Sequence, residues 1–483
     1  MRPKLLLTML AATLAACWNV ALGGLQDEIA AAVAEAGCTS RAVSVAVRDC
    51  RSGDIVAGIS SSTPRIPASN QKLVTSGMAA RVLGADFRFE TRLLRRGNDL
   101  IVAGDGDPAL ADDALLADMR TADGGTVSAT DLLDIWAAAA ASSGVRHVET
   151  LIIDDRVFDR VWRPAGWPRD QLHRRYCAPV SGLNFSCNTM SFRPAPGGGG
   201  VDVSDAWPDW GGIRIVNKLK RGRKGRDTHV VHGSHQPDRG GIVLTGTVVE
   251  PTIAPVEIAV EEPPQHFGML LAARLAASGI QVDEVRLASE TDPPAAGELV
   301  APPITTSLET VMRRCNHDSY NLYADAMFKR VAHETTGRPG SWEDGARVIT
   351  RTVEQIVGPD TGLTVVDGSG MSRLNTISAR AMTEWLCSFD PSSPDDAFFI
   401  ASLSRPGEGK MHKRFREVDL HGAEVRAKSG YLRSVYALSG YVTCQDGHRF
   451  AFSILINDPP RKVKAKRLQD EIVSLIATQC DGG

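Results

Sequence analysis

Ser69 and Lys72 are the first residues in the chain whose types and spacing could support covalent chemistry. They lie three positions apart at the start of an apolar-periodic run, so a helix beginning there would carry both side chains on one face. Pro67 is typical of the first turn of a helix, where the dipole favours a developing negative charge. Lys72 could take the serine proton if burial lowered its pKa. The competing interpretation is a serine that caps the helix and a lysine in solvent.

Two later triplets offer the other groups that an acyl-transfer site needs. Ser319-Tyr320-Asn321 presents a hydroxyl and an amide at the predicted start of a helix. Lys428-Ser429-Gly430 ends a predicted strand and offers a cation, a hydroxyl and a glycine where a ligand must approach the backbone. Each triplet alone is weakly specific. In the order Ser-x-x-Lys, Ser-x-Asn, Lys-Ser/Thr-Gly they match the penicillin-recognising serine enzymes, in which the three motifs converge on one cleft.

The flanking residues make the resemblance closer. The chain resembles the class C low-molecular-mass penicillin-binding proteins, the D-alanyl-D-alanine carboxypeptidase/endopeptidase family. The 250 positions between Ser69 and Ser319 are many more than in compact β-lactamases, and they fit the two domains that this family inserts there. The matching stretches cover nearly all of the exported chain and are Pro67-Ala68-Ser69-Asn70-Gln71-Lys72-Leu73, Gly104-Asp105-Gly106-Asp107-Pro108, Ala178-Pro179-Val180-Ser181, Ser319-Tyr320-Asn321-Leu322-Tyr323-Ala324, Asp367-Gly368-Ser369-Gly370-Met371-Ser372-Arg373, Lys428-Ser429-Gly430 and Leu438-Ser439-Gly440-Tyr441.

The resemblance implies the catalytic roles. Ser69 would be the acylated nucleophile and Lys72 its general base. Ser319 would relay a proton to the leaving D-alanine amine, and Asn321 would hold the substrate amide. No metal and no cofactor is needed for this chemistry.

The resemblance also implies the substrate-binding residues. Lys428 and Ser429 would bind the terminal carboxylate of the substrate. The backbone N–H groups of Ser69 and of Tyr431, which follows Gly430, would form the oxyanion hole. The family usually has threonine at the positions of Ser429 and Tyr431. The serine keeps a hydroxyl, whereas the tyrosine is bulkier and is expected to alter substrate preference and β-lactam affinity.

The implied function is a serine-type D-Ala-D-Ala carboxypeptidase or endopeptidase that acts on peptidoglycan stem peptides and is acylated by β-lactam antibiotics. One alternative is a serine β-lactamase, which the long insertion and the lack of a recognisable deacylating glutamate motif disfavour. Another is an inactive wall-binding protein of the same fold, which the presence of Ser69 with Lys72 disfavours. The sequence does not distinguish carboxypeptidase from endopeptidase activity, and it does not indicate an oligomeric state.

The hydrophobic periodicity predicts an α/β (α+β) protein in several parts. The resemblance implies the penicillin-recognising fold over residues 25–85 and 290–483, with a central antiparallel sheet flanked by helices and an all-helical lobe. An inserted α/β domain is expected over residues 86–193 and 252–289. A small β domain, residues 194–251, would be nested inside that insertion, after a Pro- and Gly-rich break.

The first residues predict export. Arg2 and Lys4 precede an uncharged apolar run that is too short to span a bilayer, so residues 1–23 form a predicted signal peptide. Leu14-Ala15-Ala16-Cys17 resembles a lipobox, which would leave Cys17 lipidated, while Ala21-Leu22-Gly23 suits ordinary cleavage. Either outcome places the protein in the periplasm or the cell envelope.

The formal net charge of -3 gives no reason to expect nucleic acid as a partner.

Eight cysteines would remain after Cys17, an even number that suits an oxidising compartment. Cys177 and Cys187 are close enough in sequence to close one loop, but the connectivity cannot be derived.

A separate feature is a run of six cations within residues 218–226. It is either the solvated tip of a hairpin or a contact with an anionic wall polymer.

Overall fold

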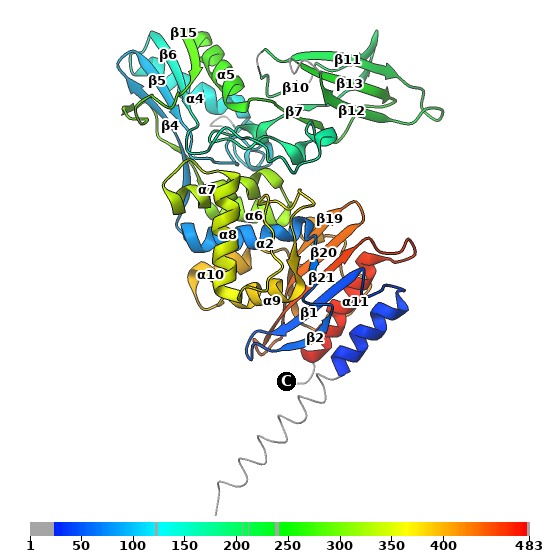
Figure 1. Cartoon of the computed structure of the whole chain (residues 1–483). Coiled ribbons are helices and arrows are strands. Elements are labelled where there is room, and N and C mark those ends of the chain that lie inside the picture. The colour runs from blue at the N-terminus through cyan, green and yellow to red at the C-terminus, as the bar shows by residue number, and fades with distance from the viewer. Residues whose placement is uncertain (1–23, 121–123, 205, 211, 237–240, 481–483) are drawn as a thin grey trace, which may run out of the picture. The chain divides into compact units, whose positions relative to one another are not determined.

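The computed structural model describes residues 24–120, 124–204, 206–210, 212–236 and 241–480 (Figure 1). The chain forms two compact units. Unit 1 comprises the residues up to Ala85, Met312–Tyr320 and the residues from Gly345 on, and unit 2 comprises Asp86–Val311 and Asn321–Asp344. The predicted signal peptide and Cys17 lie outside the described residues. The domain boundaries proposed from the sequence stay a prediction.

Unit 1 is organised around a five-stranded antiparallel sheet with the strand order β19-β20-β21-β1-β2. The two ends of the chain meet in it, because β1 pairs with β21 along its whole length. Nearly every residue of β20 and β21 is buried, which confirms the prediction of central strands covered on both faces. The bounds are β1 (Val43–Asp49), β2 (Ile55–Ile59), β19 (Glu424–Leu432), β20 (Val435–Thr443) and β21 (Arg449–Asn457).

Helices cover both faces of this sheet (Figure 1). On one face, Leu25 and Ile29 of the helix at residues 24–35 share a core with Leu468 and Ile472 of α11 (Ala465–Ala477) and with strand residues. On the other face, α9 (Ala379–Cys387) packs on β1 and β21. The remaining helices of this unit are α2 (Gln71–Leu83), α10 (Pro394–Ala401), most of α6 (Leu308–His317) and most of α8 (Trp342–Val357).

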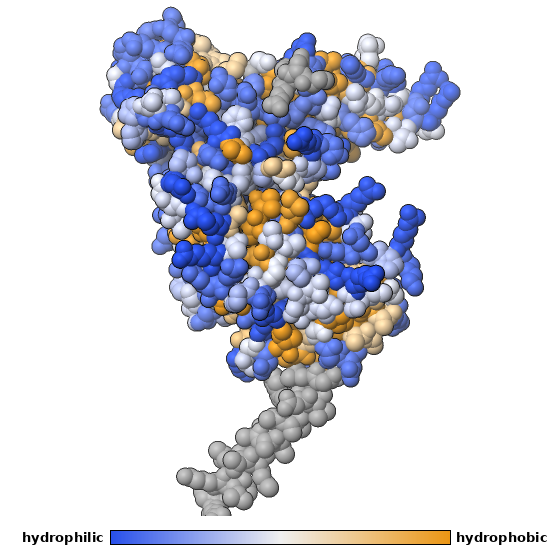
Figure 2. Space-filling model, in the orientation of Figure 1, coloured by the Kyte–Doolittle hydropathy of each residue, from blue (hydrophilic) through white to orange (hydrophobic). Residues whose placement is uncertain are grey.

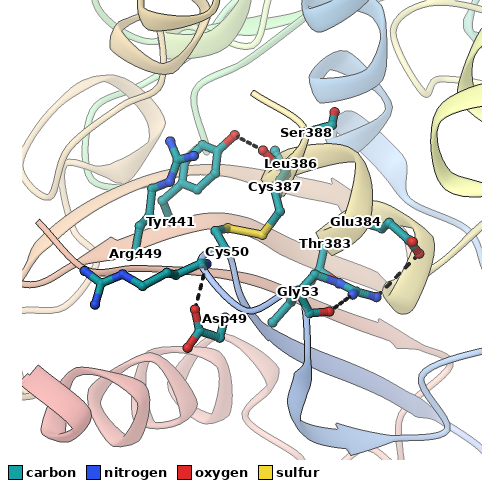
Figure 3. Close-up of a disulfide and its surroundings, with 12 residues drawn as sticks. Asp49, Cys50, Gly53, Thr383, Glu384, Leu386, Cys387, Ser388, Tyr441 and Arg449 are labelled. Atoms are coloured by element: carbon teal, nitrogen blue, oxygen red, sulfur yellow. Dashed lines mark hydrogen bonds and ion pairs between the residues drawn. A yellow bond between two sulfur atoms is a disulfide. The ribbon is translucent and has the colours of Figure 1, made fainter. Parts of the chain in front are cut away.

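Two disulfides cross-link unit 1. Cys50, just after β1, is bonded to Cys387 at the end of α9, across 337 residues of sequence (Figure 3). Beside this bond the Tyr441 hydroxyl donates to the carbonyl of Leu386 at 2.7 Å, so the end of α9 is held to the sheet twice. The second disulfide joins Cys444 to Cys480 across 36 residues. Cys177 and Cys187, the pair that the sequence placed on one loop, are both buried in unit 2.

Unit 2 contains a mixed six-stranded sheet with the order β15-β6-β5-β4-β16, in which β17 also pairs with β4. Helices α4 and α5 pack together, and their apolar residues share one core with β4, β5 and β6. The bounds are β4 (Arg88–Arg96), β5 (Asp99–Ala103), α3 (Asp113–Leu116), α4 (Ala129–Ser142), β6 (His147–Asp154), α5 (Pro263–Ala277), β15 (Gln281–Leu287), β16 (Glu298–Leu299), β17 (Ile304–Ser307) and α7 (Asn321–Thr336).

A smaller three-stranded sheet lies between β6 and α5 in sequence, with the order β11-β13-β12. Its strands are β11 (Arg214–Arg221), β12 (Val230–His235) and β13 (Gly241–Val248). Here the hairpin that the sequence suggested around residues 218–226 is wrong. β11 and β12 do not pair, because β13 lies between them, parallel to β11 and antiparallel to β12.

The expected fold class is confirmed, with helices on both sides of an antiparallel sheet in unit 1 and mixed α/β structure in unit 2. Among the described helices, none has the length and the apolar character needed to cross a membrane.

Candidate active site

Ser69 lies in a tight turn at the start of a buried helix. The sequence predicted one helix from this point, whereas the structure has a 3₁₀ turn, η1 (Ala68–Asn70), before α2. Ala68 has a φ of 46°, in the left-handed region that a residue with a side chain rarely adopts. The Asn70 Nδ2 donates to the Oγ of Ser439 on β20 at 2.6 Å, which ties the turn to the central sheet. Such strained backbone persists where the surrounding structure fixes it, as at many functional sites.

Lys72 is the basic group next to Ser69. Its side chain is completely buried, with 0% relative exposure, so the interpretation as a solvated lysine is wrong. Its Nζ lies 3.2 Å from the Ser69 Oγ and donates to the carbonyl of Ser369 at 2.8 Å. Nζ and Oγ are therefore within the distance needed for direct proton transfer.

The loop at residues 367–375 braces this pair, and the sequence analysis assigned it no role. Asp367 shapes it by accepting from the backbone N–H groups of Gly370 and Ser372, each at 2.7 Å. The Thr75 hydroxyl of α2 donates to the carbonyl of Gly368 at 2.7 Å. Gly370 has a φ of 79°, and a Cβ on it would lie 1.8 Å from the Ala68 carbonyl oxygen. The Asp-Gly-Ser-Gly sequence predicts a turn, but only the tertiary fold brings this turn against Ser69 and Lys72.

Ser319 and Lys428 are brought together in unit 1. The Lys428 Nζ donates to the Ser319 Oγ at 2.8 Å and to the carbonyl of Ser429 at 2.9 Å. Ser319 does not open a helix as predicted. It lies between α6 and α7 with a φ of 61°. Burial lowers the pKa of Lys428 well below its usual value, and the charge of Lys72 lowers it further.

Gly430 is the point where strand β19 packs closely against Ser69. A Cβ at this position would lie 2.9 Å from the Pro67 carbonyl oxygen and 3.0 Å from the Ser69 backbone nitrogen. Tyr431 is next in the strand, so its side chain projects from the opposite face of β19, where its ring centroid is 5.4 Å from that of Tyr436. The Tyr431 side chain is 60% exposed, so it does not lie between Gly430 and Ser69.

Comparison with known proteins decides the family. Residues 25–479 match the D-Ala-D-Ala carboxypeptidase 3 (S13) family. The chain belongs to this family. A D-alanyl-D-alanine carboxypeptidase from an Actinomadura species is 30% identical over 94% of this chain and 85% of its own length. The D-alanyl-D-alanine carboxypeptidase DacB from Haemophilus influenzae is 24% identical over 85% of this chain and 84% of its own.

The S13 fold is shared as well. The crystal structure of penicillin binding protein 4 from Haemophilus influenzae superposes with a TM-score of 0.72, at 22% identity, over 90% of this chain and 96% of that one. A second structure of that protein, complexed with a novel β-lactam, gives a TM-score of 0.69 at 21% identity, over 93% and 98% of the two chains. The predicted family is thereby confirmed, and this S13 protein is a serine-type D-Ala-D-Ala carboxypeptidase.

The predicted site residues are not all found in one unit. Unit 1 brings together Ser69, Lys72, Ser319 and Lys428, with the backbone of Gly430 against the nucleophile. Asn321 is the first residue of α7 and belongs to unit 2, where its Nδ2 donates to the carbonyl of Tyr176 at 2.8 Å. The proposed contact of Asn321 with substrate therefore stays a prediction.

Proposed function

We propose that Ser69 is the nucleophile of this carboxypeptidase and that it attacks the terminal D-Ala-D-Ala peptide bond of peptidoglycan stem peptides. The observation that carries the proposal is the fully buried Lys72 amine, 3.2 Å from the serine oxygen. A neutral amine at that distance accepts the hydroxyl proton as the oxygen adds to the carbonyl carbon. Because the Ser369 carbonyl accepts from the same nitrogen, the amine is held in one orientation.

The leaving D-alanine must receive a proton as the peptide bond breaks. Ser319 and Lys428 supply the route, since the Lys428 Nζ donates to the Ser319 Oγ and that hydroxyl can in turn donate to the departing amine. Lys428 is also the cation that would attract the terminal carboxylate of the substrate, with the Ser429 hydroxyl beside it. The products of this half-reaction are free D-alanine and an ester on Ser69, which water then hydrolyses.

Two backbone N–H groups, those of Ser69 and Tyr431, would stabilise the oxyanion formed during attack. The close packing of Gly430 supports this pairing, because a Cβ at that position would lie only 3.0 Å from the Ser69 nitrogen. Removing one such donor typically costs about 3 kcal/mol in the transition state. Asn321 would bind the substrate amide.

The same site would open the strained amide of a β-lactam, leaving the drug as an ester on Ser69. Such substrates place the enzyme outside the cytoplasm, in the periplasm or the cell envelope. Cys17 is a candidate lipid anchor there.

The test is the intact mass of the purified protein with benzylpenicillin over time, beside release of D-alanine from a soluble D-Ala-D-Ala peptide. A persistent adduct and released D-alanine are expected for the wild type, and neither is expected for Ser69→Ala. The Ser142→Ala variant is the matched control, because it also loses one hydroxyl, at an exposed position of α4 in unit 2, and should still form the adduct. A short-lived adduct with consumed penicillin would instead indicate a β-lactamase. Adduct formation by Ser69→Ala would disprove the assignment of the nucleophile.

A further inference from the structure

The small β11-β13-β12 sheet of unit 2 has two chemically different faces. Ile242 and Leu244 of β13 point into the unit 2 core, and Ile215 and Leu219 of β11 pack against that core. Because side chains alternate along a strand, Lys218 and Lys220 project from the other face. Both are exposed.

That outer face forms rows across the three strands. Lys218 is in register with Thr245, which is in register with His232, and all three are exposed. Lys220 is in register with Thr247 in the next row. Cationic and hydroxyl groups therefore line one open surface, which we call the cationic face.

Three more cations follow β11 and extend the cationic face, and every one is exposed: Arg223, Lys224 and Arg226. Within the described part of the chain, Lys224 is the only member of the 218–226 run with an ion pair, to Glu250 at 3.5 Å. Both partners are more than half exposed, so that pair neutralises little of the charge. Figure 2 shows hydrophilic side chains over the outer end of this sheet.

A concentrated patch of one sign is unexpected in a chain whose net charge is -3. Exposed charges that are not paired within the protein act at a distance of about one Debye length, roughly 8–10 Å, and raise the local concentration of oppositely charged partners. Lysine and hydroxyl groups presented together on one exposed face suit an extended partner with repeated anionic groups.

We infer that the cationic face binds the anionic groups of the cell-wall polymer and so holds the enzyme on its insoluble substrate. This inference rests on the proposed function, in which stem peptides of that polymer are cleaved. The anions are carboxylates of the stem peptides or phosphates of polymers attached to the wall.

The experiment compares two triple variants of the full chain, each also carrying Ser69→Ala so that the wall is not digested. Lys218→Gln/Lys220→Gln/Lys224→Gln removes three charges from the cationic face. Lys462→Gln/Lys464→Gln/Lys466→Gln removes three charges near the start of α11 in unit 1 and is the matched control. Co-sedimentation with purified insoluble peptidoglycan at low salt gives the apparent Kd. We expect it to rise about tenfold or more for the first variant and to stay near the parent value for the control.

Chemical treatment of the peptidoglycan identifies the anion. Loss of binding after the carboxylates are amidated indicates stem-peptide carboxylates, and loss after hydrogen fluoride removes phosphate polymers indicates phosphate. Either result supports the inference that the cationic face binds anionic groups of the wall polymer. Parent-like binding by the first variant, or an equal loss in both variants, would overturn it.

With Ser69 intact, the first variant should release D-alanine more slowly from insoluble peptidoglycan and at the wild-type rate from a soluble peptide. Equal rates for wild type and variant on insoluble peptidoglycan would count against the inference. A wild type that releases no D-alanine from the soluble peptide would instead refute the proposed function, whereas the sedimentation result would still stand.

Discussion

The two units use lysine in opposite ways. In unit 1, Lys72 and Lys428 are buried, and each Nζ is held by a backbone carbonyl and a serine hydroxyl. In unit 2, Lys218 and Lys220 are exposed. Burial lowers the pKa of Lys428, which favours proton transfer. The exposed lysines of unit 2 lie where an anionic partner can reach them. The same side chain therefore suits chemistry in one unit and attachment in the other.

Removing one lysine from each unit should give the largest difference in activity. Lys72→Ala should lower kcat/KM for a soluble D-Ala-D-Ala peptide on the order of 10³- to 10⁴-fold, because the general base is lost. Lys220→Ala should leave kcat/KM within about twofold of the wild-type value, since Lys220 is an exposed residue of unit 2 with no role in the proposed reaction. Initial rates of D-alanine release measure both. A Lys72→Ala enzyme that kept a tenth of its activity would end the assignment of Lys72 as the base.

The Cys50–Cys387 bond should stabilise unit 1 alone. The double variant Cys50→Ala/Cys387→Ala is expected to lower the free energy of unfolding of unit 1 by about 3 kcal/mol, since the bond closes a very long loop. Cys444→Ala/Cys480→Ala is the comparison, with a smaller loss because it closes 36 residues. Hydrogen exchange read separately for β1 and β6 measures the two units. Equal losses in both strands would contradict a role confined to unit 1.

Glycines offer a third contrast. Gly430→Ala should lower kcat/KM about 100-fold, because the new methyl group would press on the Pro67 carbonyl and the Ser69 nitrogen. In unit 2, Gly198 has no atom within 4 Å of its Cβ position, so Gly198→Ala should leave activity unchanged. The rate of acylation by benzylpenicillin gives a second readout. Wild-type acylation of Gly430→Ala would show that the close approach is not required.

Asp107 is a buried acid in unit 2, and burial raises its pKa to about 6. The unfolded chain ionises near its ordinary pKa of about 4, while folded Asp107 keeps its proton up to about pH 6. The free energy of unfolding is therefore unaffected below about pH 4, falls between about pH 4 and 6, and then levels off about 3 kcal/mol lower.

Asp107→Asn should remove this fall. In the variant the amide oxygen still accepts from the Ala109 N–H. The Thr306 hydroxyl donates to Asp107 in the wild type and can accept from the asparagine NH2 group in the variant. Urea unfolding of unit 2 at pH 4 and pH 7, followed by hydrogen exchange in β5, gives the difference for each protein. If the free energy of unfolding of Asp107→Asn fell by the same amount between pH 4 and pH 7, a group other than Asp107 would be responsible.

Local patterns predicted the elements well where the chain itself sets them. The sequence predicts a strand at residues 55–59 after the Ser52-Gly53 turn, and the structure has β2 there. It also predicts a hairpin turn at Gln445-Asp446-Gly447, which joins β20 and β21 in the structure. Each of these depends on alternation or turn chemistry within a few residues. The motifs likewise identified the lysines and serines that the fold brings together around Ser69.

Features set by distant contacts could not be predicted. The left-handed φ values of Ala68 and Ser319 are imposed by surrounding packing, so no local pattern signals them. The insertion of β13 between β11 and β12 depends on a parallel pairing that residue alternation does not encode. The partner of Cys50 is 337 residues away, beyond any spacing rule.

The pairing of β1 with β21 also dictates an order of events during synthesis. The first strand of the central sheet is made early, but its neighbour is residues 449–457, near the end of the chain. Unit 2, whose residues lie almost entirely between these strands in sequence, can gain its own core before that neighbour exists. The sheet that holds Ser69 closes only when the last tenth of the chain is available, so an incomplete or early-terminated polypeptide has no assembled hydrolase site.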